Sequence, residues 1–239
     1  EMTSSLVGSE MCIRDRVEPA THCIPEFIKL VEGLLEKGYA YVAGGNVYFD
    51  TAKLEKYYVF NDHNEEDLAV GVREGVEEDQ NKRNKADFVL WFTKSKFEDQ
   101  ELKWDSPWGV GYPGWHIECS CISKKHLGEY LDLHCGGIDN AFPHHTNEIA
   151  QSECCNGVPF AHYWMHNGFI NVDNHKMSKS LGNFFTVRDV AEKYGYEPIR
   201  YMMVACQYRS PINYSYEVIE QAKNSLERLY LSLIHISEP

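Results

Sequence analysis

The sequence lacks the features that would place it in a membrane or on a broad nucleic-acid surface. No run approaches the roughly 18 consecutive apolar residues of a spanning helix, and no basic segment followed by an apolar core marks a secretory signal. Positive charge is scarce, because 23 Lys and Arg stand against 36 Asp and Glu, for a net charge of −13. That balance argues against an extended nucleic-acid-binding surface. We therefore expect no membrane partner, and any nucleic acid must be bound by local basic positions.

A disulfide framework is also absent, although the chain carries 8 cysteines. Their irregular spacing in a chain of 239 residues is not that of a small secreted domain. A reducing, cytoplasmic compartment is predicted instead. With 43% hydrophobic residues, this length can bury one good core, or one domain and a smaller one.

Cysteine, histidine and glutamate stand at metal-ligand spacing in the middle of the chain. His144 and Glu148 are four residues apart within PHHTNEIAQSE, a stretch with helical periodicity. Such residues share one helix face, with Cβ atoms about 5–6 Å apart. That spacing suits two ligands of one zinc ion, and Cys119 would supply a third, thiolate ligand. Spacing alone does not exclude the alternatives, which are that His144 is an ordinary histidine at a helix start and that Cys119 is a buried, inert cysteine.

A lysine-rich loop follows the metal-ligand pattern. In KMSKS, Lys176 and Lys179 lie three residues apart between serines, just before Gly182. Lysine binds phosphate as a point charge, although a solvated surface turn has the same composition. The position of this loop after a zinc-like pattern favours phosphate binding.

Four motifs, in this order and spacing, resemble the cysteinyl-tRNA synthetase family: GWHIECS, HCGGID, FPHHTNEIAQSE and KMSKSLGNFFTVRD. The resemblance runs from about Val17 to Tyr230. It implies a class I aminoacyl-tRNA synthetase with a Rossmann-like catalytic domain, acting on L-cysteine, ATP with magnesium, and tRNA(Cys). It also implies one zinc ion per chain, which binds the substrate thiolate directly, and a cytoplasmic monomer is expected.

The resemblance assigns the cysteine end of the site. Residues that match the family's zinc ligands are Cys119, His144 and Glu148. Trp115 matches an aromatic wall of the cysteine pocket, with core packing as the alternative. His134 matches a histidine beside the substrate, with a structural histidine as the alternative.

The ATP end is assigned in the same way. Lys179, with Lys176, would stabilise the charge that develops on the phosphates of ATP. Asp139 would accept the ribose hydroxyls, as acidic residues do beyond the carboxyl ends of strands. His166 is expected at such a strand end beside the nucleotide.

Three parts of the family pattern have no counterpart in the sequence. They are the His-x-Gly-His phosphate element, the first Rossmann strand with its zinc-binding cysteine, and the helical anticodon-binding region. We therefore expect an internal fragment that is inactive by itself and holds zinc poorly. Two other interpretations stay open: a ligase that joins cysteine to an amino sugar in mycothiol biosynthesis, and a non-catalytic zinc-binding relative.

Periodicity and turn residues predict alternating helices and strands. Helices are expected over 25–37, 115–127, 142–155, 187–195, 198–206 and 216–230, with Thr186 as an N-cap, and strands over 39–42, 47–49, 86–92, 130–134 and 162–165. Residues 61–85 are charged and weakly periodic, which predicts a solvated excursion. The predicted fold class is α/β: the second half of a Rossmann-like nucleotide-binding domain, with a small α+β insertion and a C-terminal helical segment that carries the KMSKS loop.

The expected divisions of the chain follow from these elements. Both ends, SLVGSEMCIRDR and LSLIHISEP, resemble translated sequencing-adapter read-through rather than native protein. The divisions are a non-native tail over 1–16, a connective insertion over 17–113, the half-domain with the zinc site over 114–168, the KMSKS loop and its helices over 169–230, and a second non-native tail over 231–239.

Overall fold

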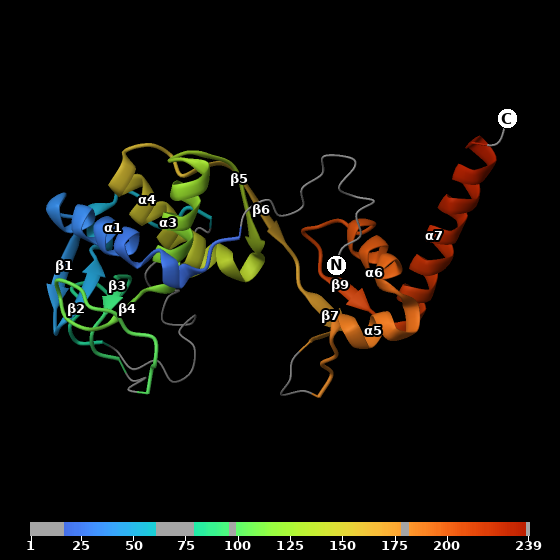
Figure 1. The fold of residues 1–239 in the computed structure, drawn as a ribbon, viewed down its shortest axis with the longest axis horizontal. Helices are drawn as coiled ribbons and strands as arrows, with labels where there is room; N and C mark the ends of the chain where they lie inside the picture. The colour runs from blue at the N-terminus through green and yellow to red at the C-terminus, as the bar shows by residue number, and fades with distance from the viewer. Residues whose placement is uncertain (1–16, 61–78, 96–98, 178–181, 238–239) are drawn as a thin grey trace. The chain divides into compact units, whose positions relative to one another are not determined.

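The computed structural model describes residues 17–60, 79–95, 99–177 and 182–237 and divides into two compact units (Figure 1). The first unit comprises the chain up to Asp132 together with Phe142–His162. The second comprises Leu133–Ala141 and the chain from Tyr163 onward. Both units mix helices and strands, which is the predicted α/β content.

The first helix of the first unit, α1 (Ile24–Glu36), begins with Pro25 in its first turn, where proline costs no hydrogen bond. Its apolar stripe is buried, and Phe27, Val31 and Leu34 are wholly inaccessible to solvent. The predicted helix over 25–37 is confirmed. The stripe packs into a core that also contains Val47, Phe49, Leu90 and Trp91 from the neighbouring sheet.

That sheet is antiparallel in the order β1 (Ala40–Ala43), β2 (Asn46–Phe49), β3 (Phe88–Phe92) and β4 (Tyr112–Pro113). A tight turn joins β1 to β2, and both central residues, Gly44 and Gly45, have positive φ, as hairpin turns of this length require. The predicted hairpin and the predicted strand near 86–92 are confirmed. The short strand β4 was not predicted.

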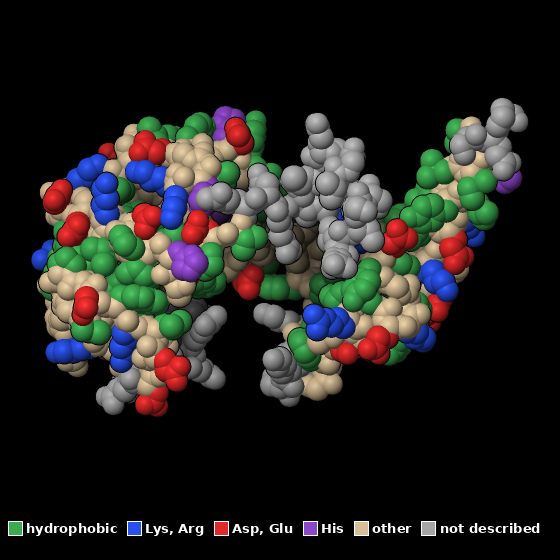
Figure 2. Space-filling model, in the orientation of Figure 1, with side chains coloured by type: hydrophobic (Ala, Val, Ile, Leu, Met, Phe, Trp, Pro, Cys, Tyr) green, Lys and Arg blue, Asp and Glu red, His purple; other side chains and the backbone are tan. Residues whose placement is uncertain are grey.

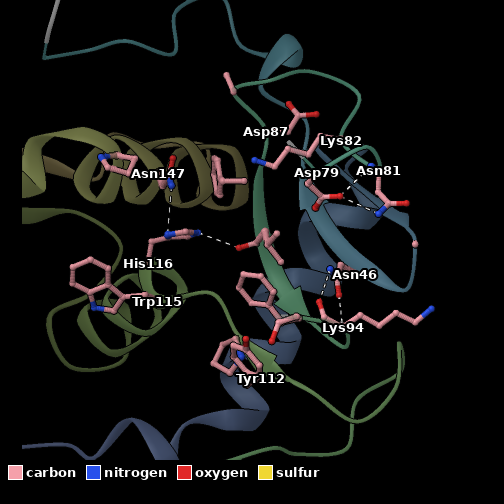
Figure 3. Close-up of a pocket in the computed structure, with 18 of the residues that line it drawn as sticks. Asn46, Asp79, Asn81, Lys82, Asp87, Lys94, Tyr112, Trp115, His116 and Asn147 are labelled. Carbon is pink, nitrogen blue, oxygen red and sulfur yellow. Dashed lines mark hydrogen bonds between the residues drawn. The ribbon is translucent and has the colours of Figure 1, made fainter. Parts of the chain in front are cut away.

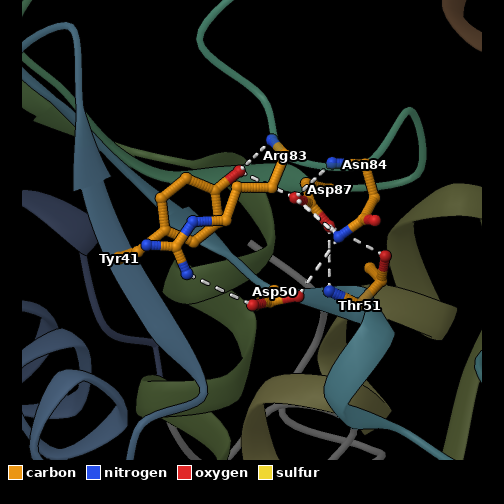
Figure 4. A network of polar contacts seen from close by, with 6 residues as sticks. All are labelled: Tyr41, Asp50, Thr51, Arg83, Asn84 and Asp87. Atoms are coloured by element: carbon orange, nitrogen blue, oxygen red, sulfur yellow. Dashed lines mark hydrogen bonds and ion pairs between the residues drawn. The ribbon is translucent and has the colours of Figure 1, made fainter.

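A buried carboxylate ties the end of the predicted excursion to this sheet (Figure 4). Asp87 is 1% exposed and accepts hydrogen bonds from the Tyr41 hydroxyl at 2.7 Å, the Thr51 amide at 2.9 Å and the Asn84 amide at 3.0 Å. We call Asp87 with Tyr41, Thr51 and Asn84 the clasp. Residues 61–78 lie outside the described residues, but 79–87 are held against the sheet.

Two further helices complete the first unit, α3 (Trp115–Leu127) and α4 (Thr146–Asn156), and they lie together with α1 on one side of the sheet (Figure 1). The helix predicted over 115–127 is confirmed. The helix predicted from residue 142 begins only at Thr146, because Phe142 is extended (φ −139°, ψ 133°) before Pro143 and a π-type turn occupies Ala141–His145. Proline disfavours helical geometry in the residue before it, and the periodicity argument overlooked this.

Two strands, β5 (Leu131–Gly137) and β6 (Ala161–Asn167), pair with each other and carry the chain from the first unit into the second. Both are longer than predicted. His134 and His166 were expected at strand ends, but each lies within its strand. The strand β5 continues past His134 and ends at Gly137. Asp139 does lie beyond β5, in the 3-10 turn Ile138–Asn140.

The second unit contains a three-stranded sheet that the sequence analysis did not predict. Its order is β8 (His175–Lys176), β7 (Ile170–Val172) and β9 (Ile212–Tyr214), with β7 and β9 parallel. The three helices predicted for this part of the chain are present: α5 (Val187–Tyr194), α6 (Tyr196–Val204) and α7 (Tyr216–Ser237). They pack with the sheet around a core that includes Met202, Tyr214 and Ile219.

Local details of this unit follow from the sequence. Thr186 is the N-cap of α5, as predicted, and it forms a capping box with Asp189: the Thr186 side chain accepts from the Asp189 amide, and the Asp189 carboxylate accepts from the Thr186 amide. The last helix continues past Tyr230 to Ser237, and Leu231, Leu233 and Ile236 on it are exposed.

The surface agrees with the charge composition. On the face drawn in Figure 2, Lys and Arg side chains are interspersed with Asp and Glu over the first unit. Among the described residues, none of the helices is both long and apolar enough to cross a membrane.

Candidate metal centre

Three of the predicted metal ligands meet in the first unit. The ligand atoms of Cys119, His144 and Glu148 all lie within 4.8 Å of one another. His144 Nε2 and Glu148 Oε1 are 3.8 Å apart, and these two residues are 5% and 0% exposed. Cys119 is half-buried. The structure thus brings together side chains from positions up to 29 residues apart in the sequence.

Two helices and one turn position the ligands. Cys119 lies one turn into α3, and Glu148 lies in the first turn of α4. His144 was predicted to share a helix with Glu148. It lies instead in the turn that precedes α4, and that turn still brings its imidazole over the carboxylate.

The electrostatics of the cluster favour a bound cation. Burial, together with the negative charges of Glu148 and Glu118, raises the pKa of Cys119 to about 12. The thiol therefore stays protonated beside a buried carboxylate unless a positive charge enters. A coordinated metal ion removes the proton from a thiol. One sulfur, one imidazole nitrogen and one carboxylate oxygen make a donor set typical of zinc, so the residues present fit that ion.

Aromatic rings surround the cluster on the histidine side. The Trp115 ring stacks on His144 with centroids 4.0 Å apart and planes inclined by 27°. Trp115 is 61% exposed, so core packing does not explain its position. His145, which the sequence analysis did not single out, places Nε2 3.9 Å from Glu148 Oε2 and is 2% exposed. Its position next to His144 in the sequence was the signal that could have identified it.

The remaining predicted residues lie in the second unit or outside the described residues. The His134 ring meets Trp164 edge to face at 4.9 Å, and Trp164 stacks on His166 at 6.2 Å. Burial, with the charge of His134, lowers the pKa of His166. The backbone of Lys176 lies in β8, whereas Lys179 falls in 178–181, outside the described residues.

Asp139 is exposed and lies close over the backbone of β5. Its Oδ1 lies close to Gly137, 2.5 Å from where a Cβ on that residue would stand. Its role toward a ribose stays a prediction.

A cavity of about 1360 Å³ opens beside the cluster in the first unit (Figure 3). Its wall includes Trp115, His116, Pro143 and Asn147 from the helices and their approaches, and Asp87 and Lys82 from the sheet side. His116 is the residue at its inner end that sequence reasoning missed. Burial lowers the pKa of His116 to about 3, so its ring is neutral.

Comparisons with known proteins agree on one family. Residues 6–224 match the family model described as tRNA synthetases class I (C) catalytic domain. A cysteine–tRNA ligase of Clostridioides difficile is 52% identical over 91% of this chain and 46% of its own length. One from Brevibacillus brevis is 51% identical over 90% of this chain and 45% of its own. The chain therefore spans about half the length of the curated relatives it matches.

A solved structure supports the fold. Methionyl-tRNA synthetase of Mycobacterium tuberculosis, in complex with methionyl-adenylate, superimposes with a TM-score of 0.59 at 17% identity. The match covers 89% of this chain and 52% of that one.

Proposed function

The chain belongs to the family of class I tRNA synthetase (C) catalytic domains, and from this premise we propose that it is the metal-binding part of a cysteine–tRNA ligase. The observation that carries the proposal is the buried cluster of Cys119, His144 and Glu148, whose ligand atoms lie within 4.8 Å of one another. A cluster of this composition, in a chain half identical to proteins named cysteine–tRNA ligase, suits recognition of a thiol substrate.

Zinc is the proposed ion, and these three residues would hold it. When bound, it supplies a Lewis acid that prefers a soft thiolate to a hydroxyl group, which would select cysteine over serine. In the family, a fourth ligand comes from the cysteine of the first Rossmann strand, which has no counterpart in this sequence, and the substrate sulfur would bind beside the protein ligands. Trp115 packs flat against His144 and so orients the imidazole, and its exposed face is available as a wall for the substrate side chain.

The rest of the reaction is proposed from the family. L-cysteine and ATP with magnesium would form cysteinyl-adenylate, and the cysteinyl group would then move to tRNA(Cys). His134 would lie beside the amino acid, Asp139 and His166 beside the nucleotide, and Lys176 and Lys179 on the phosphates. In this scheme β5, α4 and β6 form the strand–helix–strand of a Rossmann-like half-domain. A cytoplasmic monomer completes the proposal.

Replacement of Cys119 with serine tests the metal centre. Cobalt is a useful probe because a bound thiolate gives it a sulfur-to-cobalt charge-transfer band. In the 239-residue chain, binding is expected to be weak because one ligand of the family is missing, but wild type titrated with excess Co²⁺ should show that band, and added L-cysteine should intensify it. In Cys119→Ser the protein's contribution to the band should vanish, and the affinity for Co²⁺ should fall by at least the roughly 100-fold that the loss of an outer-shell partner can cost.

A matched control is Cys154→Ser, which removes another half-buried thiol of the same unit that is not part of the cluster. It should leave the band and the affinity as in wild type. An unchanged band in Cys119→Ser, or a lost band in Cys154→Ser, would contradict the proposed ligand set.

A further inference from the structure

The faces of α3 and α4 that meet beside the ligands are polar. On α4, Asn147, Gln151 and Ser152 are 2%, 0% and 2% exposed, and on α3 Ser120 is 2% exposed. Packed helices usually bury an apolar stripe at such a contact. We call His116, Ser120, Asn147, Gln151 and Ser152 the polar interface.

Gln151 is the centre of the polar interface. Its Nε2 donates to the His116 carbonyl oxygen at 2.6 Å and to Ser120 Oγ at 2.6 Å. Ser152 Oγ donates to the same Ser120 Oγ at 2.9 Å. Ser120 directly follows Cys119, so these hydrogen bonds hold the turn of α3 that carries the thiol.

A second set of hydrogen bonds holds the start of α4 (Figure 3). His116 Nε2 lies 3.2 Å from the carbonyl oxygen of Val89, which can only accept, so Nε2 carries the proton of the neutral ring. Nδ1 is then the acceptor for Asn147 Nδ2 at 3.4 Å, and Asn147 Oδ1 accepts from the Tyr57 hydroxyl at 2.5 Å. Asn147 directly precedes Glu148, so this chain of bonds joins the carboxylate's turn to α3 and to β3.

Polar contacts constrain register in a way that apolar contacts do not. Apolar side chains keep most of their contact energy when two helices slide past each other by a fraction of the 1.5 Å rise per residue. A hydrogen bond weakens steeply when its distance or angle departs from a narrow range. Metal coordination tolerates distance errors of only about 0.2 Å. An interface that fixes two helices is therefore suited to a metal site whose ligands come from both.

We propose that Gln151 and Asn147 are positioning residues for the metal centre. They act by setting the register of α3, with Cys119, against α4, with Glu148. This inference rests on the proposed function, because it needs a metal at the cluster.

Gln151→Met is the direct test, in the 239-residue chain. Methionine keeps the length and volume of the side chain and removes both donated bonds, and Ser120 Oγ keeps Ser152 as its donor. We expect the Co²⁺ affinity, measured by competition with a chelator, to fall by about tenfold, the low end for residues outside the ligand set. The sulfur-to-cobalt band should weaken or shift, while the metal-free protein stays folded with a modestly lower thermal midpoint, because two neutral hydrogen bonds are lost. Asn147→Leu should also lower the Co²⁺ affinity, and it serves as the test if Gln151→Met does not fold.

The matched control lies on the same two helices. Lys124 Nζ donates to Asn156 Oδ1 at 2.6 Å, at the end of α4 far from the ligands. Asn156→Ala should leave the cobalt affinity and spectrum as in wild type. If it weakens cobalt binding as much as Gln151→Met, or if both interface variants keep the wild-type affinity and band, the positioning role is wrong. A wild-type chain that gives no sulfur-to-cobalt band would instead remove the proposed metal centre, and this inference with it.

Discussion

The clasp and the polar interface are both buried and hydrogen-bonded, yet they are built from different chemistry. At the clasp, an ionised carboxylate, Asp87, accepts from two backbone amides and from side chains on three other segments. At the polar interface every member is neutral, because His116 has a pKa of about 3 and the others are amides and hydroxyls. One arrangement concentrates its interactions on a charge, and the other spreads them along two helices.

This difference teaches what each arrangement does for the first unit. A buried charge costs much to desolvate, and it is stable only while its donors stay in place, so its removal strands several buried groups at once. A hydrogen bond between neutral groups contributes less to the free energy of unfolding than one to a charged group, although it fixes geometry equally well. The clasp should therefore govern stability, and the polar interface should govern the geometry of the metal centre.

The largest effect is expected from Asp87→Ala. Loss of the carboxylate leaves the Tyr41 hydroxyl and the Thr51 amide buried without their acceptor, and we expect the free energy of unfolding to fall by about 3–4 kcal/mol. Urea denaturation followed by circular dichroism measures this. Asp99→Ala, at an exposed position, should change stability by less than about 0.5 kcal/mol. Equal losses in the two variants would mean that the clasp is not a special source of stability.

A smaller effect is expected on acidification. Burial alone would raise the pKa of Asp87, but the hydrogen bonds from Tyr41, Thr51 and Asn84 outweigh it, and the net pKa is lowered. A carboxyl group with a lowered folded-state pKa contributes stability that is present above its unfolded pKa and is lost as the pH falls through the folded one. The stability difference between wild type and Asp87→Asn should therefore shrink from neutral to acid pH. A difference that stays constant would show that Asp87 is not ionised in the folded protein.

The smallest effect is expected from Ser152→Ala. It removes one neutral bond of the polar interface, to Ser120 Oγ, and leaves Gln151 as a second donor to that atom. The free energy of unfolding should fall by about 0.5–1 kcal/mol, by the same amount at neutral and at acid pH. Denaturation at two pH values checks this. A loss as large as that of Asp87→Ala would break the proposed division between the two arrangements.

Much of the first unit could be predicted from local rules. The stripe of Phe27, Val31 and Leu34 gave α1 its predicted bounds, and the two glycines after Ala43 gave the hairpin. In the second unit, Thr186 was correctly predicted as an N-cap. Cys119, His144 and Glu148 were brought together as the family resemblance implied. Each of these depends on contacts between neighbours in sequence or on a motif with defined spacing.

What could not be predicted depends on pairing over distance. The strands β5 and β6 extend beyond their predicted bounds because each has the other as a partner, and the sheet of β7, β8 and β9 joins segments about 40 residues apart. The polar interface escaped notice for another reason. Its residues recur at i and i+4 on both helices, as His116 with Ser120 and Asn147 with Gln151, but a polar helix face is read as solvent-facing unless the partner helix is known.

The discontinuity of the first unit has a consequence for synthesis on the ribosome. Contacts of α1 reach far along the chain: Lys37 donates to the Cys155 carbonyl oxygen across 118 residues, and Lys125 approaches Cys23 Sγ across 102. At about 5–20 residues per second, the apolar stripe of α1 emerges on the order of ten seconds before α4 exists to cover it. The nascent chain therefore exposes its most hydrophobic helix throughout that interval. The clasp, which closes across 46 residues or fewer, can form well before α4 is made and give the early chain its first ordered part.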